Sequence, residues 1–230
     1  MAKMTSIALL VILLLACPPS RTVSKEKDPL ARLLEGNRRF TVGHPIHPDQ
    51  TLGRLRQLRK GQHPFAVVVS CSDSRVPPEI IFDQGLGDIF SVRTAGNVIG
   101  DYELGSIEYA VEHLGCRLIV VLGHEQCGAV SAFLQHESSS TPGHIQGILQ
   151  YLASEPEERS LPDQLKHNLD AAIRANILHG VHVLGSSEPI LHPLVEKKEL
   201  TIVGALYRID SGKVVVLDTS SQPVVDYSKP

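Results

Sequence analysis

The sequence predicts an α/β fold in which a central, mainly parallel β-sheet is flanked by helices. Short apolar runs rich in Val and Ile, such as residues 65–70 and 117–122, are typical of strands buried on both faces. Segments with apolar residues at helical spacing lie between these runs, and this alternation is the pattern of a parallel sheet covered by helices. The composition agrees, because a chain that is 42% hydrophobic and lacks Trp must build its core from smaller aliphatic side chains.

The individual elements follow from caps and apolar spacing. A helix is predicted from Asp28 to Gly43, since Asp28 is a good N-cap and Pro29 suits the first helical position. The Asp210-Ser211-Gly212 triplet predicts a turn between the last two strands, and the segment 181–184 fits neither helix nor strand clearly. The same criteria predict further helices at 51–60, 100–114, 126–135, 145–153 and 163–179, a loop at 136–143, and strands at 65–70, 88–92, 117–122, 199–207 and 213–217.

The N-terminus has the features of an export signal. Lys3 precedes a run of ten apolar or small residues that ends at Ala16, which is too short for the ~20 residues that cross a bilayer. The segment Leu14-Leu15-Ala16-Cys17 resembles a bacterial lipobox, which implies that Cys17 receives lipid. An ordinarily cleaved signal with an incidental Cys17 is the alternative. We therefore expect a lipoprotein-type signal peptide at 1–16, a tether at 17–27, a folded domain at 28–219 and a tail at 220–230.

Charge and length narrow the classes of function. The formal net charge of −3 comes from interspersed acidic and basic residues, so no basic block predicts a nucleic-acid partner. The 230 residues are enough for one α/β domain. We expect an exported, periplasmic protein that touches the membrane only through a lipid anchor on Cys17.

Three residues are candidate metal ligands. Cys71 follows the first predicted strand and His124 follows the third, so both should lie at the carboxyl edge of the sheet, where α/β folds bind ligands. Cys127 is three residues beyond His124, and on the first turn of a helix the two side chains would face the same point. Two thiolates and an imidazole suit zinc, and three protein ligands leave a fourth place for water. Cys116 has no such neighbours and is expected to be a core residue.

The segment after Cys71 adds a candidate acid–base group. In an extended stretch Asp73 and Arg75 point to the same side, so they can form an ion pair beside the metal. Arg holds a carboxylate in a fixed orientation and keeps it ionised. Such a carboxylate can accept a hydrogen bond from a zinc-bound hydroxide and direct it towards a substrate.

Together these residues resemble the β-class carbonic anhydrases. The resemblance rests on Cys71-Ser72-Asp73-Ser74-Arg75 followed by Gly123-His124-x-x-Cys127-Gly128, and on the segments 82–97 and 105–110. It covers the chain from about Pro29 to about Leu217. It implies a zinc enzyme that hydrates carbon dioxide reversibly to bicarbonate and a proton by means of zinc-bound hydroxide.

The resemblance also implies an assembly and a substrate pocket. Members of this family have an N-terminal helical arm that wraps a partner, and they form a homodimer or a dimer of dimers with active sites at the subunit interface. By position, Gln62 matches an amide that donates to the substrate oxygen, and Phe90 and Tyr109 match aromatic residues that line the pocket. Gly128 matches a small residue whose backbone N–H faces the substrate.

Two styles of active site occur in this family. In the open style water is the fourth ligand and the Asp pairs with the Arg, whereas in the closed style the Asp itself binds zinc and a bicarbonate pocket contains a Trp. The absence of Trp and the presence of Gln62 favour the open style. The proton shuttle is not identified, and His44, His47 and His63 are candidates only because an imidazole has a suitable pKa.

Three rival functions remain at this point. The first is hydrolysis of CS₂ or COS on the same scaffold with a similar zinc hydroxide. The second is a zinc-stabilised binding protein, which would need neither Gln62 nor an Asp73–Arg75 pair. The third is a thiol-redox protein, which the lack of a Cys-x-x-Cys motif disfavours.

Overall fold

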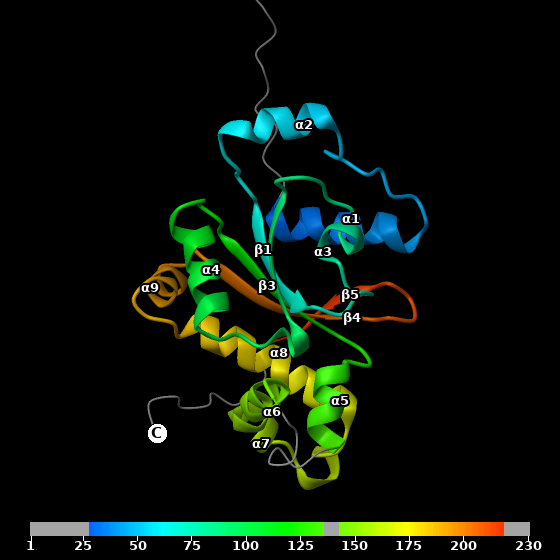
Figure 1. Cartoon of the computed structure of the whole chain (residues 1–230), viewed down its shortest axis with the longest axis vertical. Coiled ribbons are helices and arrows are strands. Elements are labelled where there is room, and N and C mark those ends of the chain that lie inside the picture. The colour runs from blue at the N-terminus through cyan, green and yellow to red at the C-terminus, as the bar shows by residue number, and fades with distance from the viewer. Residues whose placement is uncertain (1–27, 136–142, 219–230) are drawn as a thin grey trace, which may run out of the picture.

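The computed structural model describes residues 28–135 and 143–218, and a five-stranded sheet forms their centre (Figure 1). The strand order is β2-β1-β3-β4-β5, with β1 to β4 parallel to their neighbours and β5 antiparallel to β4. The predicted α/β fold with a mainly parallel sheet is therefore confirmed. The strands are β1 (Ala66–Cys71), β2 (Ile89–Thr94), β3 (Leu118–His124), β4 (Thr201–Tyr207) and β5 (Val214–Val216).

Helices cover both faces of this sheet. Successive side chains of a strand point to opposite faces, so Val67 and Val69 of β1 enter one buried apolar cluster and Ala66 and Val68 enter another. The first cluster packs against the longest helix, α8 (Leu169–Gly185), and the second packs against α1 (Pro29–Thr41). The first face is also covered by α4 (Asp101–Glu112), α5 (Gly128–Gln135), α6 (Ile145–Ser154) and α9 (Leu191–Glu196), and the second by α3 (Pro78–Ile81).

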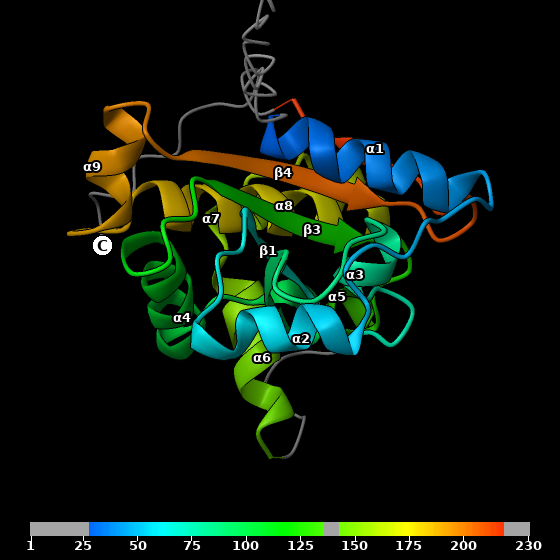
Figure 2. The ribbon, with the colours of Figure 1, turned by 90° about the horizontal axis from the view of Figure 1, so that it is seen from above.

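The start of the folded region agrees with the sequence. The Asp28 side chain accepts a hydrogen bond from the Leu30 amide at 3.2 Å, which caps α1 as predicted. The next helix, α2 (Leu52–Gln57), continues into a short 3₁₀ helix (Leu58–Lys60) and has no buried residue. It lies at the top of the molecule in Figure 1, and in Figure 2, which is seen from that side, it lies in front of neighbouring ribbons.

Two predicted helix boundaries are wrong. The helix expected at 163–179 begins instead at Leu169, where the Asn168 side chain accepts from the Ala171 amide, and it runs through 181–184. The helix expected at 126–135 begins at Gly128, because Gln126 has a positive φ of 55° and cannot continue a right-handed helix. The sequence did not predict α3, α9 or α7 (Pro156–Arg159), which have four to six residues and are too short for a periodic pattern.

A buried carboxylate joins α7 to α8. Glu157 accepts hydrogen bonds from Nδ1 of His179 at 2.8 Å and from Nδ1 of His182 at 2.6 Å. Burial opposes ionisation of this carboxyl, yet the two imidazoles outweigh burial and lower its pKa to about 2. This network fixes one end of α8 relative to the short helix α7, and therefore fixes the helix that packs across the sheet.

The order of the strands places a topological switch point at one edge of the sheet. The chain passes from β1 outward to β2, and then returns past β1 to β3 on the other side. The segments that leave the carboxyl ends of β1 and β3 therefore diverge, and such a switch point is where open α/β sheets bind ligands. Cys71 and His124 are the last residues of these two strands.

Several sequence predictions concern residues outside the described ranges. These are the signal peptide at 1–16, Cys17 and the tether at 17–27, most of the loop at 136–143, and the tail at 220–230. Within residues 28–135 and 143–218, no helix combines the length and the apolar character that a membrane span requires.

Candidate metal centre

The paired ends of β1 and β3 place two of the three predicted ligands. These parallel strands are in register up to the pair Ser70 and Leu122, with Cys71 one residue beyond Ser70 and His124 two residues beyond Leu122. Both ligands belong to strands whose residues are all buried. The sheet itself therefore sets their separation, and neither ligand depends on a mobile loop.

The backbone between His124 and the third ligand, Cys127, has a conformation that the sequence did not predict. His124 and Cys127 do not share a helical turn, because His124 ends β3 and Cys127 immediately precedes α5. The positive φ of Gln126 reverses the chain between them and returns Cys127 to the strand end. Cys127 then lies at the N-terminus of α5, where the amides of Ala129 and Val130 donate to its sulfur.

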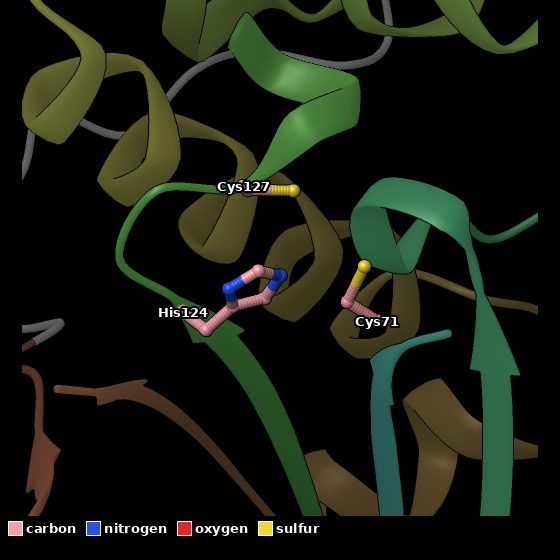
Figure 3. A group of neighbouring side chains, drawn as sticks. All are labelled: Cys71, His124 and Cys127. Atoms are coloured by element: carbon pink, nitrogen blue, oxygen red, sulfur yellow. The ribbon is translucent and has the colours of Figure 1, made fainter. Parts of the chain in front are cut away.

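The three side chains converge on one point (Figure 3). Their ligand atoms, the sulfurs of Cys71 and Cys127 and a ring nitrogen of His124, all lie within 4.8 Å of one another, and all three residues are buried. Sulfurs and nitrogens around tetrahedral zinc lie at about 2.3 and 2.0 Å from the ion, which such spacing allows. The predicted cluster is thus confirmed as a group that can hold a metal ion.

His124 offers the best test of whether a metal fits. Its Nδ1 lies 2.8 Å from the Glu125 carbonyl oxygen, an arrangement that makes Nδ1 the proton donor and leaves Nε2 with a free lone pair. Nε2 is buried and has no hydrogen-bond partner among the described residues. An unpaired buried nitrogen costs free energy, and a metal ion between this nitrogen and the two sulfurs would remove that cost.

A hydrogen bond between the two cysteines favours a negative charge on one of them. Cys127 hydrogen-bonds Cys71, which lowers the pKa of the Cys71 thiol to about 4, and the same contact raises the pKa of Cys127. Backbone amides of Asp73 and Gly96 also donate to the Cys71 sulfur, at 3.4 and 3.3 Å. One sulfur is therefore a thiolate near neutral pH, and thiolate is the form that binds zinc.

Asp73 and Arg75 form the predicted ion pair beside this group. Arg75 Nε donates to Asp73 Oδ1 at 2.9 Å and Arg75 Nη2 donates to Oδ2 at 2.7 Å. This guanidinium lowers the pKa of the Asp73 carboxyl to about 2. Asp73 Oδ2 is 3.9 Å from Nε2 of His124, so the carboxylate borders the cluster while it stays paired with Arg75.

The structure adds supporting groups that the sequence analysis missed. Arg93 donates through Nε to the carbonyl of Cys71 and through Nη2 to that of Asp73, and so fixes the segment between them. Gly96 lies in a 3₁₀ turn after β2 and supplies the amide that faces Cys71. The only signal for these groups was the segment 82–97, which the resemblance included without a role for either residue.

The predicted pocket residues do not reach this cluster within one chain. Gln62 is exposed and precedes β1, so it lies beyond the strand end opposite to Cys71. Phe90 pairs in register with Val67, four residues before Cys71, which is about 13 Å away along the strand. Tyr109 accompanies Phe90, with ring centroids 6.4 Å apart, and 48% of Tyr109 is exposed.

The other candidates are placed as follows. Gly128 is exposed at the start of α5, and a Cβ atom there would meet nothing within 4 Å. His44, His47 and His63 are exposed, and a role for any of them as proton shuttle stays a prediction. Cys116 is a core residue as expected, since it is 1% exposed, its thiol donates to the Pro64 carbonyl at 3.2 Å, and burial raises its pKa to about 11.

Comparisons with known proteins agree on one family. The family model described as carbonic anhydrase matches residues 66–214. Carbonic anhydrase 2 of Mycobacterium tuberculosis is 42% identical over 194 residues, which cover 81% of this chain and 90% of that protein. The β-carbonic anhydrase CcaA superimposes with a TM-score of 0.66 at 30% identity, over 83% of this chain and 96% of that one. A tetrameric β-carbonic anhydrase from Sordaria macrospora gives 0.62 at 27% identity, over 71% and 85%.

Substitution of one thiol should remove the metal. We expect Cys71→Ser to lose at least 90% of the zinc that the purified wild-type chain retains, because two remaining ligands bind weakly. Metal content per chain, measured by inductively coupled plasma mass spectrometry, checks this. Cys116→Ser is the matched control, since it removes an equally buried thiol outside the cluster, and it should keep the wild-type zinc content. Full zinc content in Cys71→Ser would contradict the assignment.

Proposed function

The chain belongs to the β-class carbonic anhydrases and catalyses the reversible hydration of carbon dioxide, and we propose that it does so with a zinc ion held by Cys71, His124 and Cys127. One observation carries the choice of cofactor. The buried Nε2 of His124 lacks a partner and faces two thiols, which is a donor set that suits zinc. Three protein ligands leave the fourth coordination place to water, as the open style of site requires.

The protein supplies orientation and a hydrogen-bond acceptor to this reaction. When bound, zinc lowers the pKa of a water molecule towards about 7 and so makes hydroxide available near neutral pH. Asp73 borders the cluster and accepts the hydrogen bond of that nucleophile, which turns the attacking lone pair towards carbon dioxide. Arg75 donates to both carboxylate oxygens of Asp73 and so restrains the carboxylate from turning towards the ligands.

The low pKa of Asp73 also limits its role. With a pKa of about 2 the carboxylate stays ionised through the whole neutral and mildly acidic range. It therefore acts as a permanent hydrogen-bond acceptor and does not take up the proton that the reaction releases. The change of activity with pH above about 5 must come from another group, and that proton must leave by another route.

The substrate pocket requires a second copy of the chain. Gln62, Phe90 and Tyr109 lie towards the start of β1, whereas the metal ligands lie at its end. In a two-fold dimer each chain can place this group beside the metal centre of the other, so that two complete sites form from two halves each. The exposed faces of Tyr109 and of Leu52 and Leu55 on α2 would then be covered. We therefore propose a homodimer, alone or paired into a tetramer.

The N-terminal segment adds a location to this proposal. Residues 1–27 precede the described region, and the lipobox-like Leu14-Leu15-Ala16-Cys17 supports export followed by lipid attachment to Cys17. The enzyme would then work in the periplasm on a tether of about ten residues. Carbon dioxide crosses membranes and bicarbonate does not, so an anchored enzyme would interconvert them next to the bilayer.

Removal of the Asp73 charge should slow turnover without loss of the metal. We expect Asp73→Asn to lower kcat for carbon dioxide hydration by about 100-fold, because the amide can donate to the nucleophile and misdirect it. Stopped-flow hydration assays and zinc analysis on the same sample check both parts. Asp170→Asn, which breaks only an exposed ion pair with Arg174, should retain wild-type kcat. Full activity of Asp73→Asn would remove Asp73 from the mechanism.

Mixed oligomers test whether Gln62 serves the partner's site. Gln62→Ala and Asp73→Asn chains should each form nearly inactive homodimers. Co-expressed in equal amounts, they should recover about a quarter of the wild-type activity, because half of the dimers are mixed and each contains one intact site. A mixture that is no more active than its components would contradict the shared site, while the zinc assignment would stand.

Lipid attachment can be measured directly. We expect the mature chain to begin at Cys17 with a mass increased by its acyl groups, and to partition into the membrane fraction. Cys17→Ser should move the protein to the soluble periplasmic fraction with unchanged carbonic anhydrase activity. Intact-protein mass spectrometry and cell fractionation check this, and a mature N-terminus other than residue 17 would contradict it.

A further inference from the structure

A single buried amide interrupts the apolar surface of α8. Asn176 is 3% exposed, and its neighbours along the chain, Ala175 and Ile177, are 3% and 0% exposed. A polar side chain in such a place needs a partner, because burial of an unpaired amide is costly. Asn176 finds it 80 residues away, where Nδ2 donates to the Gly96 carbonyl oxygen at 2.8 Å.

Gly96 is the residue whose amide faces the metal ligand Cys71. Its N–H donates to the Cys71 sulfur at 3.3 Å, so one residue accepts from Asn176 on one side and donates to the thiolate on the other. Gly96 has a φ of +69°, in the left-handed region. Thr94 Oγ1 closes the same turn by donating to the Val98 carbonyl at 2.6 Å. The turn therefore has both its ends and its centre fixed.

We propose that Asn176 is a positioning residue for the metal ligand Cys71, and that it acts by holding the Gly96 amide against the Cys71 sulfur. The contact runs from α8 through the turn after β2 to the end of β1. An N–H that points at a thiolate withdraws part of its negative charge and fixes the direction of its lone pairs. Without Asn176 the Gly96 residue can rotate, so the sulfur would donate more charge to a bound metal from a less defined position.

A purely structural role predicts something different. If Asn176 only ties α8 to the turn, its loss lowers the free energy of unfolding and leaves the electronic character of the sulfur unchanged. The two roles therefore differ in the spectrum of a bound metal and not in stability. This inference rests on the proposed metal site. Cobalt(II) reports on that site directly, because it absorbs in the visible and near-ultraviolet range when thiolates bind it.

The experiment compares Asn176→Leu with the wild-type chain, both loaded with cobalt(II). We expect the thiolate-to-cobalt charge-transfer band of the variant to move to lower energy, because the sulfur loses its hydrogen bond. We also expect zinc affinity, measured by competition with a chromophoric chelator, to fall by about 10-fold. Asn176→Ser is a second variant in case Asn176→Leu folds poorly. Its hydroxyl is too short to reach Gly96, so it should shift both quantities in the same direction.

Leu178→Ala is the matched control on the same helix. Leu178 is buried beside a cavity lined by residues of α7, of α8 and of the segment between them. Its truncation should lower the free energy of unfolding without any change in the band or in zinc affinity. An unchanged band in both Asn176 variants, or an equal shift in Leu178→Ala, would overturn the positioning role. A wild-type chain that lacks a charge-transfer band would instead overturn the metal site itself, so the two failures are distinguishable.

Discussion

Everything at the site depends on the parallel pairing of β1 with β3. These strands lie at the centre of the sheet, they are buried along their whole length, and they end side by side at Cys71 and His124. Their neighbours β2 and β4 lie on opposite sides, so the segments that follow Cys71 and His124 diverge and leave room at the strand ends. A register shift of one residue would point Cys71 to the other face of the sheet, away from His124. The same aliphatic packing that stabilises the core therefore also sets the geometry of the ligands.

The sequence predicted the parts of this arrangement that follow from local pattern. The structure contains the predicted strands, with ends that differ by at most two residues, and it brings Cys71, His124 and Cys127 together. The predicted Asp73–Arg75 pair is also present. The path from His124 to Cys127 was predicted wrongly, because a helix and a tight turn both bring residues three apart to one point. Only the backbone conformation of Gln126 separates these possibilities. Asn176 could not be predicted to reach Gly96, since 80 residues separate them and the sheet order decides the contact.

The pocket residues show a different limit of the sequence. Gln62, Phe90 and Tyr109 were associated with the metal centre through resemblance alone, and a single chain holds them near the other end of β1. A strand of six residues is about 20 Å long, so no adjustment of side chains could close that distance. A two-fold symmetric dimer provides the simplest solution. In it the pocket residues near the start of β1 in each chain can lie beside the metal ligands at the end of β1 in the other chain. In such a dimer the second copy would cover the exposed part of the half-buried Tyr109.

The charges at the centre are balanced by two separate means. Backbone amides face the sulfurs: those of Asp73 and Gly96 donate to Cys71, and those of Ala129 and Val130 donate to Cys127. The carboxylate of Asp73, by contrast, is balanced by the full positive charge of Arg75. Dipoles stabilise a thiolate without neutralising it, so the sulfurs keep most of the negative charge that holds a divalent cation. Arg75 therefore keeps Asp73 ionised by direct contact, whereas its charge acts on the two sulfurs only through space.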